Sequence, residues 1–160
     1  MQITLRPFTD ADLPIFTAWL HRPHVRPWYT PAEDWLTEIR ERDGAYSFIR
    51  HFIILGDGAP IGFCQYYPYW LSGEDWHGNL PLEGAYSVDY LIGDPENLRK
   101  GYGSAAIRLL AADALKRPDA RRVIVQPDTE NLASGNALLS AGFLWDSINQ
   151  LYRLERTAEG

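Results

Sequence analysis

A five-residue turn segment, Gly56–Pro60, is the feature that most restricts how this chain can fold. It separates two runs rich in β-branched and aromatic residues, Tyr46–Leu55 and Ile61–Trp70, and this arrangement is typical of a β-hairpin. A hairpin in the middle of the chain places antiparallel strands at the centre of the fold. A dinucleotide-binding domain, whose sheet consists of parallel strands and crossover helices, is therefore not expected.

Strand and helix patterns alternate along the rest of the chain. Helices are predicted over residues 9–20, 31–42, 101–116 and 131–141, and strands over residues 3–8, 86–92 and 122–126, with one or two more within 143–154. Thr9 and Thr30 each resemble a helix cap, and residues 71–85 have the composition of a long loop. Because no repeat or linker interrupts these patterns, residues 1–160 are expected to form a single α+β domain on a mixed sheet.

The composition argues against several classes of protein. Twenty-one acidic and fifteen basic residues give a net charge of −6, which disfavours nucleic-acid binding and favours a cationic partner. The single cysteine cannot form an internal disulfide, and the four histidines lack the spacing of a metal site, so no metal is expected. No apolar run approaches the roughly 20 residues of a membrane span, so the sequence predicts a cytoplasmic protein that does not bind membranes.

Acidic and aromatic residues are concentrated in one part of the sequence. Residues 51–98 contain no Lys or Arg but seven acids, which are Asp57, Glu74, Asp75, Glu83, Asp89, Asp94 and Glu96. Aromatic residues make up 13% of the chain, and several lie in the same stretch. Carboxylates beside aromatic faces suit a cationic ligand, although a solvated acidic loop would give the same charge pattern.

A segment suited to binding phosphate follows this acidic stretch. Arg99 and Lys100 stand directly before Gly101-Tyr102-Gly103-Ser104 and a strong helix pattern. Glycines two residues apart let the backbone turn tightly, and the helix N-terminus presents N–H groups to an anion such as a pyrophosphate. The segment is not the P-loop of nucleotide-binding proteins, because no Gly-Lys-Ser/Thr follows at the required spacing.

This segment resembles the acyl-coenzyme A loop of the GNAT acetyltransferase superfamily, whose consensus is Gln/Arg-x-x-Gly-x-Gly/Ala. Gly101 and Gly103 match the consensus, whereas Leu98 departs from it. A second GNAT signature, an Asn that opens the next helix and a Gly-Phe that follows it, is matched by Asn131 and Gly142-Phe143. The resemblance implies the GNAT fold, with a mixed, mostly antiparallel sheet of about six to seven strands and about four helices, and acetyl-CoA as cofactor. The cofactor contacts that it implies are Leu91, Ile92, Arg99, Lys100, Gly101, Tyr102, Gly103, Ser104, Asn131 and Asn136.

Within the superfamily, the sequence is similar to the aminoglycoside 6′-N-acetyltransferases. The matching stretches are Leu5–Pro7, Arg26–Tyr29, Pro60–Gln65, Ser72–Trp76, Val88–Tyr90, Leu98–Gly101 and Gln126–Asn131. The similarity implies acetylation of a primary amine of an aminoglycoside antibiotic, the 6′-amino group, and hence resistance to it. The alternatives are acetylation of a ribosomal-protein or peptide N-terminus, acylation of a siderophore lysine, and a module that binds coenzyme A without catalysis. The protein is expected to be a monomer or a homodimer.

Asp89 is the candidate catalytic base, because a charged carboxylate is unusual inside the pattern of a strand and indicates a function there. The alternative is that Asp89 has a purely structural role. Amines with a pKa of roughly 8 to 10 are mostly protonated at neutral pH, so a proton must be removed before the amine attacks a thioester. The resemblance implies that backbone N–H groups at Leu91 and Ile92 polarise the thioester carbonyl. It also implies a Tyr as general acid in the last helix, where this sequence has Leu138. Cys64, in an apolar strand, is expected to be buried and inert.

The acceptor is expected where the acidic and aromatic segments converge on Asp89. The predicted acceptor-binding residues are Trp28, Tyr29, Tyr66, Glu74, Asp75, Trp76, Asp89 and Asp128. Ring faces of an amino sugar would lie on the aromatic side chains, and its ammonium groups would meet the carboxylates. For Tyr66, packing in the core is the alternative.

Overall fold

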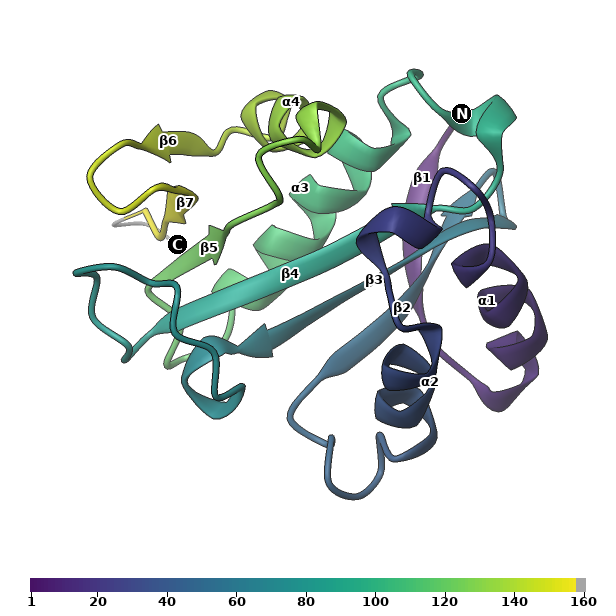
Figure 1. Ribbon diagram of the computed structural model, residues 1–160, viewed down its shortest axis with the longest axis horizontal. Coiled ribbons are helices and arrows are strands. Elements are labelled where there is room, and N and C mark those ends of the chain that lie inside the picture. The colour runs from purple at the N-terminus through teal and green to yellow at the C-terminus, as the bar shows by residue number, and fades with distance from the viewer. Residues whose placement is uncertain (158–160) are drawn as a thin grey trace.

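The computed structural model describes residues 1–157, which form a seven-stranded sheet with helices on both faces (Figure 1). The strands are β1 (Ile3–Pro7), β2 (Arg50–Gly56), β3 (Ala59–Pro68), β4 (Ala85–Ile92), β5 (Arg122–Val125), β6 (Leu144–Asp146) and β7 (Leu151–Glu155). The helices are α1 (Leu13–Leu20), α2 (Ala32–Arg40), α3 (Tyr102–Leu115) and α4 (Leu132–Ser140), and in the described part of the chain none of them is long and apolar enough to cross a membrane.

The order of the strands in the sheet is β1-β2-β3-β4-β5-β7-β6. Every pair of neighbours is antiparallel except β4 and β5, which are parallel. This confirms the α+β class and the mixed, mostly antiparallel sheet that the sequence predicts. Of the domain predicted over residues 1–160, the last three residues lie outside the described part.

The predicted hairpin is formed by β2 and β3. Its turn residues Asp57 and Gly58 both have positive φ, of 49° and 83°, as a two-residue hairpin turn requires. Strand β2 begins at Arg50, later than predicted, because the residues before it form turns. The N–H of Tyr46 donates to the carbonyl of Glu41, and the N–H of Ile49 donates to the carbonyl of Tyr46.

The two N-terminal helices begin differently from each other. The N–H of Thr9 donates to the Asp12 carboxylate (2.8 Å), which confirms the predicted capping box, and Arg6 pairs with the same carboxylate (2.8 Å). Helix α2 begins one residue later than predicted. Pro31 is extended (φ −77°, ψ 145°) and is itself the cap residue. The prediction that Thr30 caps this helix is therefore wrong.

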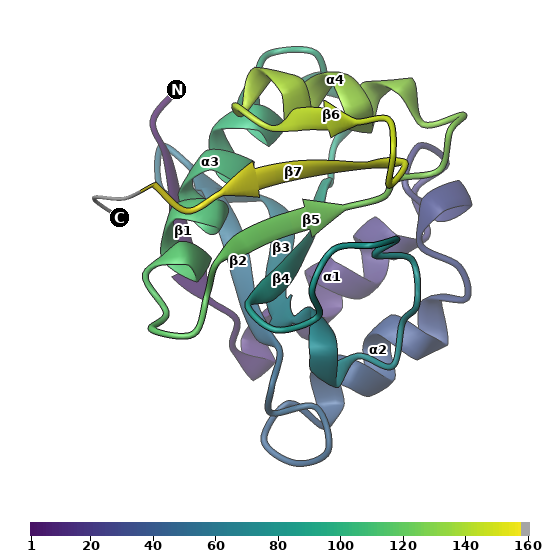
Figure 2. The ribbon, with the colours of Figure 1, turned by 90° about the vertical axis from the view of Figure 1, so that its left-hand side faces the viewer.

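The sheet separates two layers of core. Phe16 and Trp19 of α1 pack with Phe63 on one face, where α2 also lies, whereas Ile107 and Leu110 of α3 pack on the other face together with α4 (Figure 2). Side chains of a strand alternate between the faces. In β4, residues 89 and 91 consequently face α1 and α2, and residues 88, 90 and 92 face α3 and α4.

Strands β4 and β5 remain paired only at their beginnings. The pairs are Ala85 with Arg122 and Tyr86 with Val123, after which the two strands diverge (Figure 1). From residue 88 onward, no strand of residues 1–157 pairs with β4 on this side. The divergence leaves a free strand edge between α4 and the loop that precedes α2.

Candidate active site

A cavity of about 800 Å³ opens along the free edge of β4. Its lining comes from the loop before α2, from β4, from the loop and first turn of α3, and from the segment between β5 and the end of α4. Tyr67, Glu74 and Trp76 complete one wall. Because these segments are far apart in the sequence, the divergence of β4 and β5 is what brings them together.

At one end of the cavity, the loop before α3 has the form of an anion cradle. Gly101 has a φ of 81° and Arg99 a φ of 60°, so the chain turns sharply where the helix begins. Among the described residues no side chain caps this helix, so the N–H groups of its first turn remain available to a ligand. The predicted residues that line the cavity here are Arg99, Gly101, Tyr102, Gly103 and Ser104. Lys100 is exposed and does not line the cavity.

Gly103 allows α3 and β4 to approach each other closely. A Cβ atom at this position would lie 3.1 Å from Cε2 of Tyr90, closer than ordinary van der Waals contact. The Tyr90 ring therefore rests against the first turn of α3. A side chain at position 103 would have to displace that ring.

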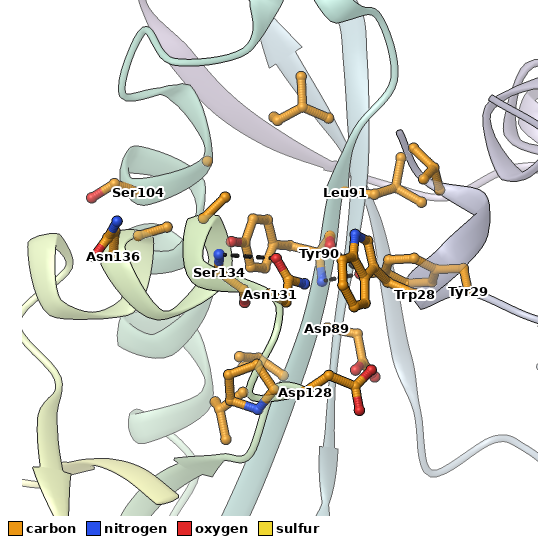
Figure 3. A pocket seen from close by; sticks show the side chains of 18 of the residues that line it. Trp28, Tyr29, Asp89, Tyr90, Leu91, Ser104, Asp128, Asn131, Ser134 and Asn136 are labelled. Carbon is orange, nitrogen blue, oxygen red and sulfur yellow. Dashed lines mark hydrogen bonds between the residues drawn. The ribbon is translucent and has the colours of Figure 1, made fainter. Parts of the chain in front are cut away.

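The start of α4 contributes two predicted residues, Asn131 and Asn136, to the cavity lining. The side-chain oxygen of Asn131 accepts a hydrogen bond from the N–H of Ser134 (3.2 Å), so this residue also caps α4 (Figure 3). Leu138 is fully buried in the core. It brings no hydroxyl group to the cavity from the position at which the GNAT resemblance implies a Tyr.

Two side chains from the loop before α2 occupy the free edge of β4. The Tyr29 hydroxyl donates to the carbonyl of Tyr90 and accepts from the N–H of the same residue (3.1 Å; Figure 3). Nε2 of His24 lies 2.8 Å from the carbonyl oxygen of Ile92. The backbone N–H and C=O groups of Tyr90 and Ile92 thus point toward the cavity.

The N–H of Leu91 points in the opposite direction. Successive residues of a strand direct their backbone groups to opposite edges. Leu91 pairs with Phe63 of β3, and the N–H of Gly93 donates to the carbonyl of Ile61 on that same side. The expectation that the Leu91 N–H polarises a bound thioester is therefore wrong. Of the two predicted donors, only Ile92 has its N–H on the free edge.

Asp89 lies half-buried in the wall of the cavity. Burial raises the pKa of its carboxyl group to about 6, the nearby charge of Glu74 adds to this, and a hydrogen bond from Gln65 opposes it. Nε2 of Gln65 donates to Oδ2 of Asp89 at 2.9 Å. Asp89 is therefore mostly ionised at neutral pH and can accept a proton there.

The acceptor side of the cavity holds most of the predicted residues. Trp28, Tyr29, Glu74, Trp76, Asp89 and Asp128 all line it. In Figure 3, Asp128, from the loop after β5, extends toward β4. The Glu74 carboxylate accepts hydrogen bonds from the Tyr67 hydroxyl (2.7 Å) and the Trp76 indole N–H (2.8 Å), which hold it against the wall.

Two predicted acceptor residues lie elsewhere. Tyr66 is buried on the α3 face of β3, where its hydroxyl donates to Asp113 (2.9 Å). Adjacent residues of a strand face opposite ways, so Tyr66 points away from the side of the sheet that Gln65 faces. Asp75 points into solvent, with 96% of its side chain exposed, and does not line the cavity. Cys64 is fully buried, as predicted, and burial raises the pKa of its thiol.

Three polar residues of the site were not predicted from the sequence. Gln65 donates directly to the Asp89 carboxylate, His24 lines the cavity beside Ile92, and Glu38 of α2 responds to the charge of Asp89. Burial, together with the charge of Asp89, raises the pKa of Glu38 to about 7. A polar residue inside the apolar run of β3 was the available signal for Gln65. No local pattern indicates Glu38, since the packing of α2 on the sheet places it there.

Comparisons with known proteins agree with this geometry. The profile of the acetyltransferase (GNAT) domain matches residues 9–148. Aminoglycoside N(6′)-acetyltransferases type 1 from Klebsiella pneumoniae and from Serratia marcescens are each 28% identical over 147 residues, covering 88% of this chain and 73% of the relative. Two crystal structures of an aminoglycoside acetyltransferase, AAC(6′)-Ib, are 25% identical. The complex with ribostamycin and coenzyme A has a TM-score of 0.81 over 98% of this chain and 94% of that one. The complex with coenzyme A and kanamycin has a TM-score of 0.80 over 97% and 95%.

Proposed function

Because this chain belongs to the GNAT acetyltransferase family, we propose that it transfers an acetyl group from acetyl-CoA to a primary amine of an aminoglycoside, the 6′-amino group, and so confers resistance. The observation that carries the proposal is the place of Asp89. Its carboxylate lies in the wall of a single cavity that has an anion cradle at one end and acidic and aromatic side chains at the other. The names of the similar proteins support the same acceptor class.

The residues at the cradle end suit coenzyme A. A Cβ atom at Gly101 would meet no atom within 4 Å, so the space over this turn is open to a phosphate group. The first-turn N–H groups of α3 and the Arg99 guanidinium would hold phosphates. The extended arm would run along the free edge of β4, where Asn131 and Asn136 would contact it. Acetyl-CoA, when bound, supplies the acetyl group and a thiol leaving group.

Asp89 prepares the amine. An acceptor ammonium group that enters the cavity would donate a proton to the free oxygen of this carboxylate, Oδ1, while Gln65 holds Oδ2. A carboxylate whose pKa is near 6 is a stronger base than an exposed one and is still ionised at neutral pH. The N–H of Ile92, on the free edge of β4, would stabilise negative charge on the reacting carbonyl.

The acceptor side suits a polycation. Glu74, Asp89 and Asp128 line this part of the cavity, and the indole rings of Trp28 and Trp76 lie beside them. Ammonium groups would pair with the carboxylates, and the rings of an amino sugar would stack on the indoles.

Turnover with a panel of amines tests the proposed function. Free thiol release from acetyl-CoA should be fastest with kanamycin and should drop to background with an analogue that carries a 6′-hydroxyl group in place of the amine. Short peptides with a free N-terminus and N⁶-hydroxylysine serve as the competing acceptors. A peptide or hydroxylysine turned over more efficiently than every aminoglycoside would reject this acceptor, and no turnover with any amine would reject the catalytic role.

The dependence of KM on salt separates a polycationic acceptor from a singly charged one. Several exposed ion pairs are screened together, so KM for kanamycin should rise at least about threefold between low salt and about 0.5 M salt. Glu74→Gln should flatten this dependence with little change in kcat, because Glu74 lines the cavity. Asp75→Asn is the matched control, since the neighbouring carboxylate points into solvent. Equal effects of the two substitutions, or a KM that salt does not change, would contradict the proposal that Glu74 and its neighbours bind a polycationic acceptor.

A further inference from the structure

A row of polar side chains crosses three strands beneath α2. His51 of β2 is the register partner of Gln65 in β3, and Gln65 is in turn the partner of Asp89 in β4. All three lie on the sheet face that otherwise holds apolar side chains such as Phe63. Gln65 is 2% exposed and His51 is 7% exposed. Buried polar groups in such a place are costly unless they bind one another.

The centre of the row is the Gln65 amide. Its nitrogen donates to Oδ2 of Asp89 at 2.9 Å. An ionised carboxylate only accepts hydrogen bonds, so the NH₂ end of the amide faces Asp89. The Glu38 carboxyl group lies on the same side, and its pKa responds both to Gln65 and to the charge of Asp89.

His51 is placed to decide which way the amide faces. Burial lowers the pKa of this histidine to about 4, so it is neutral at neutral pH and keeps one N–H donor. Among the described residues neither ring nitrogen of this buried histidine has a hydrogen-bond partner. Gln65 is its register partner on the same sheet face, and the Gln65 carbonyl oxygen, turned away from the Asp89 carboxylate, is the acceptor that the register places beside this ring.

Without a donor at position 65, Asp89 would face mainly negative charge. Glu74 lies beside it in the cavity wall and Glu38 approaches from α2. The hydroxyl groups of Tyr29 and Tyr67 are committed to the backbone of Tyr90 and to Glu74, respectively. Two neighbouring carboxylates repel each other, and the pair then retains a proton to higher pH.

We propose that Gln65 is a positioning residue of this active site, which holds the Asp89 carboxylate aimed into the cavity and is oriented by His51. Its effect on turnover rests on the proposed function, because it acts through Asp89 as the base. Its effect on the titration of Asp89 does not depend on the acceptor.

The Gln65→Met variant tests the proposal through the pH dependence of kcat/KM. In the wild type, kcat/KM should fall as the pH drops below about 6, because protonated Asp89 cannot accept a proton. Removing the donor destabilises the ionised form of Asp89 and so raises its pKa. The acidic limb should therefore move to higher pH by about one unit. At pH 8.5 the loss should be less than about threefold, since Asp89 is ionised in both proteins.

The matched control is Tyr66→Phe. Tyr66 is the next residue on β3 and is also buried. Its replacement by Phe removes a hydrogen bond of the same length, to Asp113, on the other face of the sheet. The acidic limb should not move in this variant. A limb that stays in place in folded Gln65→Met, or that moves equally in both variants, would overturn the proposal.

A titration followed by ¹³C NMR of the side-chain carboxyl groups in the free protein gives a second readout. In the wild type, Asp89 and Glu38 should titrate in coupled steps, each responding to the other, and Gln65→Met should raise the Asp89 midpoint. Independent titration of Asp89 near the ordinary value of about 4 would overturn the proposal even if the variant failed to fold. Coupled titration in a wild-type protein that acetylates no amine would instead leave the positioning role intact and reject the proposed function.

Discussion

Replacing Asp89 by Asn should lower kcat/KM by about 100-fold or more, the size of effect that a positioned general base supplies. Asn keeps the shape of the side chain and can still accept the hydrogen bond from Gln65, so the local structure should survive. It cannot take a proton from an ammonium group. Steady-state kinetics with the best acceptor of the panel measure the loss.

Coenzyme A affinity gives the internal check on this variant. Because the proposed cofactor contacts are backbone groups and the cradle before α3, calorimetry should find the affinity of Asp89→Asn for coenzyme A within about twofold of the wild type. Asp75→Asn, an exposed acid from the same acidic stretch, should keep full activity. Turnover of Asp89→Asn within about threefold of the wild type would mean that Asp89 is structural and that the base lies elsewhere.

Replacing Gly103 by Val should reduce coenzyme A affinity by at least about tenfold, or about 1.4 kcal/mol. The added Cβ would lie 3.1 Å from the Tyr90 ring, and the two methyl groups beyond it need still more room. Either the ring moves into the cavity or the first turn of α3 moves away from β4. Both movements displace the N–H groups that are proposed to hold phosphate.

Leu109→Val serves as the control for this variant, because it places the same side chain on an exposed position of α3 away from the cavity. Its coenzyme A affinity should equal that of the wild type. Circular dichroism should show both variants folded. Unchanged coenzyme A affinity in folded Gly103→Val would contradict the proposal that the loop before α3 binds phosphate.

Much of the fold could be predicted from the sequence, because its elements depend on local patterns. The turn at Gly56–Pro60 identifies the hairpin, and apolar spacing identifies α3. The boundaries that differ from the prediction depend on backbone conformations that apolar spacing does not show. The start of β2 follows from the turns that the residues before Arg50 form, and the start of α2 follows from the extended conformation of Pro31.

The candidate site was harder to predict, because side-chain and backbone directions alternate along a strand. Asp89 could be identified, since a carboxylate inside a strand pattern is unusual wherever it points. Tyr66 faces the core and Leu91 directs its N–H to β3, and only the register of the sheet fixes these directions. Glu38 lies on a helix and Asp89 on a strand, so no spacing in the sequence indicates that the charge of one affects the pKa of the other.

The two side chains on the free edge of β4 bear on how this protein behaves at high concentration. A strand edge with unpaired N–H and C=O groups is a template on which a strand of another molecule can add, and this leads to aggregation. Tyr29 engages both backbone groups of Tyr90, and His24 engages the carbonyl of Ile92. Strands β4 and β5 can therefore diverge, as the cavity requires, without leaving an open edge on which a strand of another molecule can add.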